Sequence, residues 1–188
     1  MKKYGKLSGF TLIEVMLTLA IAGLIFLMMF IALPALQRSQ RDTTRREDMT
    51  NLITAIKKYQ SNNRGALPTG VPENIITYSS YSGASDQSTW AGLYRDYLGA
   101  DFVDPSGGEN YGLRIARCGE GLTPGAECNA TKSDAIANVS DKTFPNGYTI
   151  SVIISASCNG EQALATANPR KVAILYKLEG GGVYCGNT

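Results

Sequence analysis

The chain has 188 residues, enough for one domain and an appended segment, and its 18 basic and 16 acidic residues leave a formal net charge of +2. So small a charge does not indicate nucleic acid as the main partner. The sequence contains no histidine, which excludes histidine-based acid–base catalysis, Ser–His and Cys–His nucleophiles and histidine-ligated metals. No other catalytic constellation stands out, so we expect no enzyme, no catalytic residues and no cofactor.

The N-terminal segment has the pattern of a membrane span. Lys2, Lys3 and Lys6 precede a long apolar run, and residues 15–36 carry no charge. As a helix this run measures roughly 33 Å, close to the roughly 30 Å of a bilayer core. We therefore predict a transmembrane helix with the three lysines on the cytoplasmic side and the rest of the chain outside.

Two features of this segment have competing interpretations. Glu14 lies just before the uncharged run, where a carboxylate costs less than the about 2.5–3.5 kcal/mol of a charge in mid-membrane and interacts favourably with the helix dipole. The simplest interpretation of Glu14 is a charge that lies at the membrane–water interface. Ala20-Ile21-Ala22 fits a secretory cleavage site, but cleavage there leaves a long apolar N-terminus, so we do not expect an ordinary signal peptide.

The start of the segment resembles a known family. A short basic leader ending in Gly9, then FTLIEV (residues 10–15) and a long apolar helix, resembles the class III leader of type IV pilins and pseudopilins. The resemblance implies that a prepilin peptidase cuts after Gly9, where glycine leaves the backbone unhindered, and then N-methylates Phe10. It also implies that Glu14 attracts the Phe10 ammonium of a neighbouring subunit and sets the register of a filament.

The helical pattern continues beyond residue 36 but becomes polar. An apolar stripe at helical spacing predicts one buried face; its members are Met49, Leu52, Ile53, Ile56 and Tyr59. We expect one helix from about Phe10 to about Asn63, ended by Asn63-Arg64-Gly65 and only mildly kinked at Pro34.

Charged residues cluster where this helix leaves the apolar run. We expect a solvated stretch in which arginines pair with acids three or four positions away. The arginines are Arg38, Arg41, Arg45 and Arg46, and the acids are Asp42, Glu47 and Asp48.

The middle of the chain is rich in turn-forming residues, with a short helix expected over residues 89–98. DFVDPSGGENY (residues 101–111) resembles the Asp-Pro-x-Gly-x-x-Tyr turn of pilins and pseudopilins, although its second glycine, Gly108, is out of register. Asp101, Asp104 and Glu109 are oxygen ligands that calcium accepts, but their spacing does not match an EF-hand. We expect a turn with solvated acids and no metal.

The C-terminal part has the alternating pattern of strands, at residues 111–117, 147–157, 171–178 and 183–185. Few helix signals interrupt them, which favours an antiparallel sheet over βαβ units. Residues 118–146 form a long loop that must be tied down or functional. The expected fold is α+β and pilin-like, a long N-terminal helix packed on a C-terminal antiparallel β-sheet.

Four cysteines lie in this part, none in a CxxC pair, which favours disulfides in an oxidising compartment over zinc. Three pairings are open. We favour Cys158–Cys185, which resembles the C-terminal disulfide-bounded loop of many type IV pilins, together with Cys118–Cys128.

These features predict four regions: a leader (1–9), a transmembrane or filament-core helix (10–36), an amphipathic helix (37–63) and a globular head (64–188). The resemblance implies a major or minor type IV pilin, a single-pass membrane protein that becomes part of a surface filament for adhesion, twitching motility or DNA uptake. The implied partners are other pilin subunits, prepilin peptidase, membrane lipid before assembly and an assembly platform in the inner membrane. A pseudopilin of a type II secretion system is the alternative, and a membrane-anchored extracellular binding module is the third.

Overall fold

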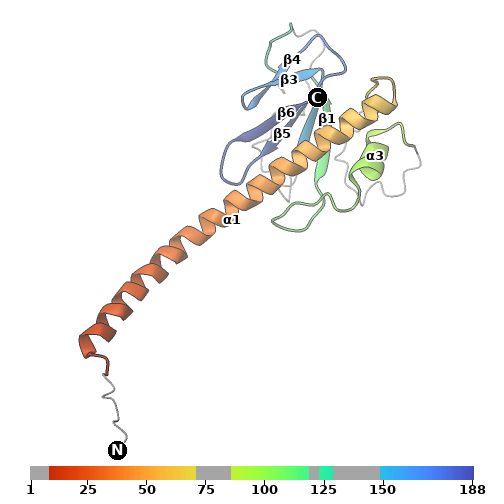
Figure 1. The fold of residues 1–188 in the computed structure, drawn as a ribbon. Helices are drawn as coiled ribbons and strands as arrows, with labels where there is room; N and C mark the ends of the chain where they lie inside the picture. The colour runs from red at the N-terminus through yellow and green to blue at the C-terminus, as the bar shows by residue number, and fades with distance from the viewer. Residues whose placement is uncertain (1–8, 71–85, 119–122, 129–148) are drawn as a thin grey trace, which may run out of the picture. The chain divides into compact units, whose positions relative to one another are not determined.

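The computed structural model describes residues 9–70, 86–118, 123–128 and 149–188, so the leader lysines and much of the predicted loop 118–146 lie outside the described residues. Two compact units divide the chain, Met1–Gln40 and Arg41–Thr188; we call the second unit the head. The elements (Figure 1) are α1 (Leu12–Asn62), α3 (Trp90–Leu93), the π-helix η1 (Tyr94–Leu98), β1 (Gly112–Arg117), β2 (Thr149–Ile154), β3 (Ala156–Asn159), β4 (Gln162–Ala165), β5 (Val172–Lys177) and β6 (Val183–Asn187).

The single long helix is confirmed. α1 runs without interruption through Pro34 and ends at Asn62. Its C-terminus is closed by a hydrogen bond from the amide of Gly65 to the carbonyl of Gln60 (2.7 Å). Arg64 and Gly65 both adopt positive φ there, the left-handed geometry in which helices commonly end.

The α+β class is also confirmed. β1, β2, β5 and β6 form one sheet in that order, and β3 pairs with β4 in a separate hairpin. β2–β5 and β5–β6 are antiparallel, but β1–β2 is parallel, so the expectation of a wholly antiparallel sheet was wrong for this pair. A parallel pair needs a crossover of a dozen or more residues, and the long connection between Arg117 and Thr149 supplies it.

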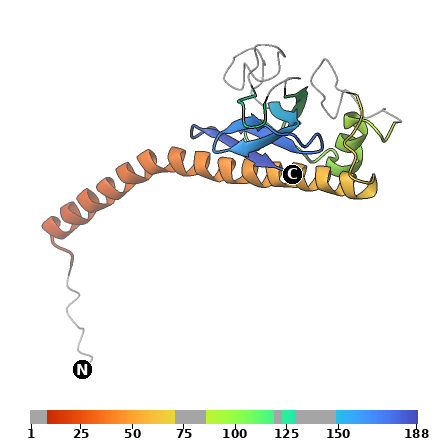
Figure 2. The ribbon, with the colours of Figure 1, turned by 90° about the horizontal axis from the view of Figure 1, so that it is seen from above.

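Both faces of the sheet are covered. On one face the predicted stripe of α1 packs against alternate residues of the strands, among them Ile150, Val152 and Ile174 (Figure 2). On the other face Ile153 and Leu175 pack against the β3–β4 hairpin. The alternation follows from the period of two in a strand, and it explains why β2 and β5 are apolar on both sides.

Three boundaries differ from the predicted ones. The expected strand 147–157 breaks at Ser155, whose φ of 61° turns the chain out of the sheet and into β3. The short β4 was missed because Gln162–Ala165 carries no β-branched residue. The expected helix 89–98 begins at Trp90, with Thr89 as its N-cap, and its second half is π-helical.

Candidate functional site

The junction between Gly9 and Phe10 lies before α1 and is open to solvent. Phe10 is 90% exposed, and no heavy atom lies within 4 Å of the position that a Cβ on Gly9 would take. Both residues are outside the helix, which begins at Leu12. The peptide bond between them is therefore accessible to a protein that approaches the N-terminal end of α1.

Glu14 is held by the residue that caps the helix. The backbone amide and the hydroxyl of Thr11 both donate hydrogen bonds to Oε2 of Glu14, at 2.8 and 2.7 Å. The amide of Glu14 donates in return to the hydroxyl of Thr11, at 3.4 Å. This is a reciprocal capping box, with Thr11 as N-cap and Glu14 three positions later.

Sequence reasoning overlooked Thr11 although the signal was present. Ser or Thr followed by Glu three positions later, before an apolar run, is the pattern of a capping box. The Glu14 carboxylate is therefore not simply an exposed interfacial charge, because its own chain supplies it with two donors. Glu14 therefore caps the start of α1 through contacts within its own chain.

The apolar part of α1 is uncovered within the described structure. Its large side chains are exposed to solvent, from Leu12 (78%) to Leu36 (57%). Among the described helices, α1 is long and apolar enough to cross a membrane. A row of exposed apolar side chains of this length needs lipid or another protein surface to cover it.

In the head, a buried ion-pair cluster fixes α1 to two turns. Arg45 is 5% exposed and binds the fully buried Asp104 through two hydrogen bonds, from Nε (2.8 Å) and from Nη2 (3.1 Å). Arg45 also donates to Asp42 at 3.0 Å and to Glu179 at 3.3 Å. Asp42 in turn accepts the backbone amides of Glu179 and Gly180, at 2.9 and 2.7 Å.

The electrostatics of this cluster favour charged carboxylates. Burial opposes ionisation of Asp104, but hydrogen bonds from Arg45, the Ser106 amide and the Tyr176 hydroxyl outweigh it and lower its pKa. The pKa of Asp42 is lowered in the same way, against burial, by the two backbone amides and Arg45. Every carboxylate in the cluster therefore has a donor that stabilises its ionised form.

This cluster corrects two predictions. Arg45 and Asp42 pair at the predicted spacing, but both are buried rather than solvated, while Arg46 and Glu47 are exposed as expected. Asp104 was predicted to be a solvated turn acid, and it is instead the buried partner of Arg45. The two lie 59 positions apart, so helical spacing gave no signal of the pair.

Oxygen ligands do not gather around the turn at residues 101–111. Asp101 and Glu109 are exposed, whereas the Asp104 carboxylate is bound by Arg45. Within the described ranges, no three acidic or cysteine side chains lie close enough together to hold a metal ion.

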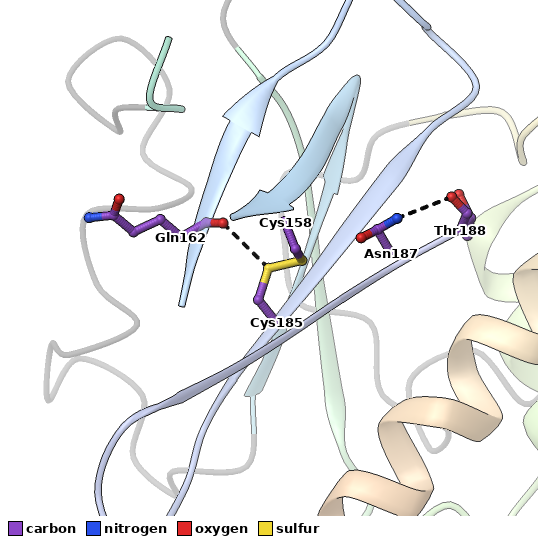
Figure 3. Close-up of a disulfide and its surroundings, with 5 residues drawn as sticks. All are labelled: Cys158, Gln162, Cys185, Asn187 and Thr188. Carbon is purple, nitrogen blue, oxygen red and sulfur yellow. Dashed lines mark hydrogen bonds between the residues drawn. A yellow bond between two sulfur atoms is a disulfide. The ribbon is translucent and has the colours of Figure 1, made fainter. Parts of the chain in front are cut away.

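The cysteines form the pairs that the sequence analysis favoured. Cys118 is bonded to Cys128 at a Cα–Cα distance of 5.2 Å, and Cys158 to Cys185 at 5.7 Å. The second bond (Figure 3) joins β3 to β6 and so links the hairpin to the four-stranded sheet. The sulfur of Cys185 lies 3.6 Å from the carbonyl oxygen of Gln162, a van der Waals contact, because a disulfide sulfur has no proton to donate.

Comparison with known proteins identifies the N-terminal segment. Residues 6–30 match the family model described as the prokaryotic N-terminal methylation motif. The matched residues include the segment that resembles the class III prepilin leader of type IV pilins and pseudopilins, and the rest of the chain is not covered by the match. No curated protein and no solved structure matches the chain.

Proposed function

We propose that this chain is a structural subunit of a type IV pilus, major or minor, and not an enzyme. The observation that carries the proposal is the methylation motif at residues 6–30, joined to a helix whose apolar side chains are exposed. The motif supports a pilin-like or pseudopilin protein that is processed by prepilin peptidase and assembles into a pilus-like filament. The leader and the apolar helix fit a membrane-anchored pilin before assembly.

Processing is proposed to occur at the accessible junction. Prepilin peptidase cuts after Gly9, and the new N-terminus on Phe10 is then methylated. The exposure of both residues outside α1 supports this step, because a protease binds an extended, unhindered substrate. Cleavage leaves Thr11 and Glu14 intact, so the capping box persists in the mature subunit.

Glu14 is proposed to have a second role between subunits. In a filament whose core is built from apolar helices, the ammonium on Phe10 of one subunit approaches Glu14 of its neighbour. Attraction between these charges grows in a medium of low dielectric, although desolvation offsets part of the gain. The capping box supports this role, because Thr11 already holds the carboxylate in one orientation before a neighbour arrives.

Two substitutions separate capping from charge. Glu14→Gln keeps a capping box, since glutamine serves at that position, but it carries no charge. Glu14→Ala removes both. We expect both variants to insert in the membrane and to yield few sheared filaments, whereas normal filament yield from Glu14→Gln would refute the role of the charge.

The first experiment is the intact mass and N-terminal fragment spectrum of protein recovered from membranes or sheared surface material. A chain that begins at N-methylated Phe10 is the expected result. A chain that keeps the leader would overturn the filament proposal and leave a membrane-anchored extracellular module.

A pseudopilin of a type II secretion system is the second candidate, because the same motif and helix occur there. The Asp104-Pro105 turn favours it mildly, whereas the cysteine-bounded loops favour a pilus. Surface filaments that depend on this chain distinguish a pilin from a pseudopilin, whose loss blocks protein secretion instead.

A further inference from the structure

A polar groove lies in the head. It is open to solvent, has a volume of about 780 Å³, and lies between the last turns of α1, residues 86–88 and η1. This volume is within the range of small-molecule sites, about 300–1,000 Å³. Unlike most such sites, its lining is mainly polar, which points to a ligand rich in hydrogen-bonding groups.

An unusual backbone element supplies one wall. η1 is a π-helix, closed by the hydrogen bond from the amide of Gly99 to the carbonyl of Tyr94, five residues back (2.9 Å). Such turns are rare and are frequently found at functional sites. Here the turn carries Asp96 and Tyr97, which line the groove.

Two aromatic rings and several amides converge there. Tyr59 of α1 and Tyr97 lie edge to face, with ring centroids 6.0 Å apart. Tyr59 is buried at 4% exposure, so the half-buried Tyr97 is the ring that a ligand reaches, and its face carries negative charge density that attracts C–H groups. Asn62 donates from Nδ2 to the hydroxyl of Tyr97 (3.0 Å), and Asn63 donates to the carbonyl of Tyr59 (2.9 Å).

Several polar atoms of the groove have no hydrogen-bond partner within the described ranges. Asp86 uses Oδ1 to accept from the amide and hydroxyl of Ser88, at 2.9 and 2.7 Å. Among the described residues, no hydrogen bond uses the other oxygen of Asp86, the amide oxygens of Asn62 and Asn63, or the side chain of Gln87. The groove therefore offers several acceptors and one amide that can donate. A ligand with neighbouring hydroxyl groups can use both kinds of partner, because each hydroxyl donates and accepts hydrogen bonds.

The charged residues that line the groove indicate which ligands it can bind. No lysine or arginine is among the described residues that line the groove. Arg95, on the same turn, is bound to Asp96 by two hydrogen bonds, at 2.6 and 2.9 Å. The remaining acid, Asp86, disfavours phosphate, sulfate and carboxylate ligands.

From these observations we propose that the groove binds a neutral saccharide. The half-buried ring of Tyr97 contacts the C–H face of a sugar ring, and Gln87, Asp86 and the asparagines accept and donate to its hydroxyl groups. The proposal goes beyond the filament role and does not depend on it, because the described residues that line the groove lie within the head of one subunit.

The test uses the full chain, unassembled, in micelles of a detergent without a sugar headgroup. A glycan array carrying neutral, amino-substituted, sialylated and sulfated saccharides identifies the class, and titration of the strongest neutral saccharide gives an affinity. Trp90 is the only tryptophan in the chain and begins α3, the short helix that continues directly into η1, so its fluorescence is a convenient signal.

The variants are chosen to separate binding from folding. Gln87 is exposed, and we expect Gln87→Ala to weaken binding about fivefold, the effect of one lost hydrogen bond. Tyr97→Ala, which also removes packing, should weaken it by more than tenfold. Gln162→Ala is the matched control, an exposed glutamine on β4 outside the groove, and should leave binding unchanged.

Three outcomes would overturn the proposal: no saccharide is retained, only sialylated or sulfated saccharides are retained, or Gln87→Ala binds as tightly as the unaltered chain. Asp86→Asn tests an alternative ligand, an amine. Binding of a charged amine should be lost with the carboxylate, whereas binding of a neutral saccharide should weaken by no more than about fivefold, because asparagine retains an oxygen acceptor.

Discussion

Replacing Arg45 with methionine should destabilise the head strongly. Methionine preserves much of the apolar stem but removes the guanidinium. Asp104, which is fully buried, then keeps hydrogen bonds from the Ser106 amide and the Tyr176 hydroxyl, at 2.8 and 2.9 Å, and a further one from the Ser106 side chain. A buried carboxylate without a counter-charge is the costly product of such a substitution.

The size of the effect follows from which partner remains. Breaking a buried ion pair costs about 3–5 kcal/mol, and we expect about 4 kcal/mol for Arg45→Met because Asp104 loses both charge-assisted bonds. Asp104→Asn should cost less, about 3 kcal/mol, because Arg45 keeps Asp42 and Glu179 as partners. At about 2–4 °C per kcal/mol, Arg45→Met lowers the melting temperature by about 10 °C.

The assay is unfolding of the full chain in detergent micelles, followed through the fluorescence of Trp90, which is buried in the head. Arg46→Met is the matched control, since Arg46 lies on the same helix but is exposed. It should change stability by no more than about 0.5 kcal/mol. The double variant Arg45→Met/Asp104→Asn should be more stable than Arg45→Met, because the unpaired charge is gone.

The stability difference between the unaltered chain and Arg45→Met should depend on pH in one direction. The pKa of Asp104 is lowered in the folded head, so its contribution to stability is present above the unfolded pKa of about 3.9 and is lost as the pH falls through the folded pKa. The gap between the unaltered chain and Arg45→Met should therefore narrow below about pH 4. Equal effects of Arg45→Met and Arg46→Met, or a gap that widens in acid, would refute the reasoning.

Further predictions concern packing, backbone and cross-links. Leu52→Ala, in the core, should cost about 2–5 kcal/mol in the same unfolding assay, whereas Leu24→Ala, on the exposed apolar stretch, should leave the head's melting temperature unchanged. Gly92→Ala should lower that melting temperature, because the new Cβ meets a backbone carbonyl oxygen at 2.5 Å; wild-type melting would show that the loop yields easily. Removing the disulfide by Cys158→Ala/Cys185→Ala should cost about 2–4 kcal/mol by denaturant titration, and no change in midpoint would show that this link adds nothing to stability.

The sequence was sufficient where the signal is local or periodic. The methylation motif, the apolar run and the stripe from Met49 to Tyr59 predicted α1 and its buried face, because helical contacts repeat every three or four positions. The capping box at Thr11 and Glu14 was equally local and could have been recognised.

The parts that could not be predicted depend on distant partners. Nothing near Arg45 in the sequence indicates Asp104 or Glu179, which contact it only after the sheet has formed. The parallel pairing of β1 and β2 depends on where the long connection between them returns to the sheet. The alternation of apolar and polar residues within a strand does not indicate whether its neighbour runs parallel or antiparallel. The groove is also tertiary, since α1 and η1 come together only in the folded head.

The placement of α1 at the start of the chain has a consequence for synthesis. The apolar stripe of α1 leaves the ribosome long before β5, which helps to cover it, and Arg45 precedes its partner Glu179 by 134 positions. Until the last strands appear, the stripe has no sheet to pack on. The head therefore forms through contacts of high sequence separation, a topology that slows folding and leaves apolar surface exposed in the interval.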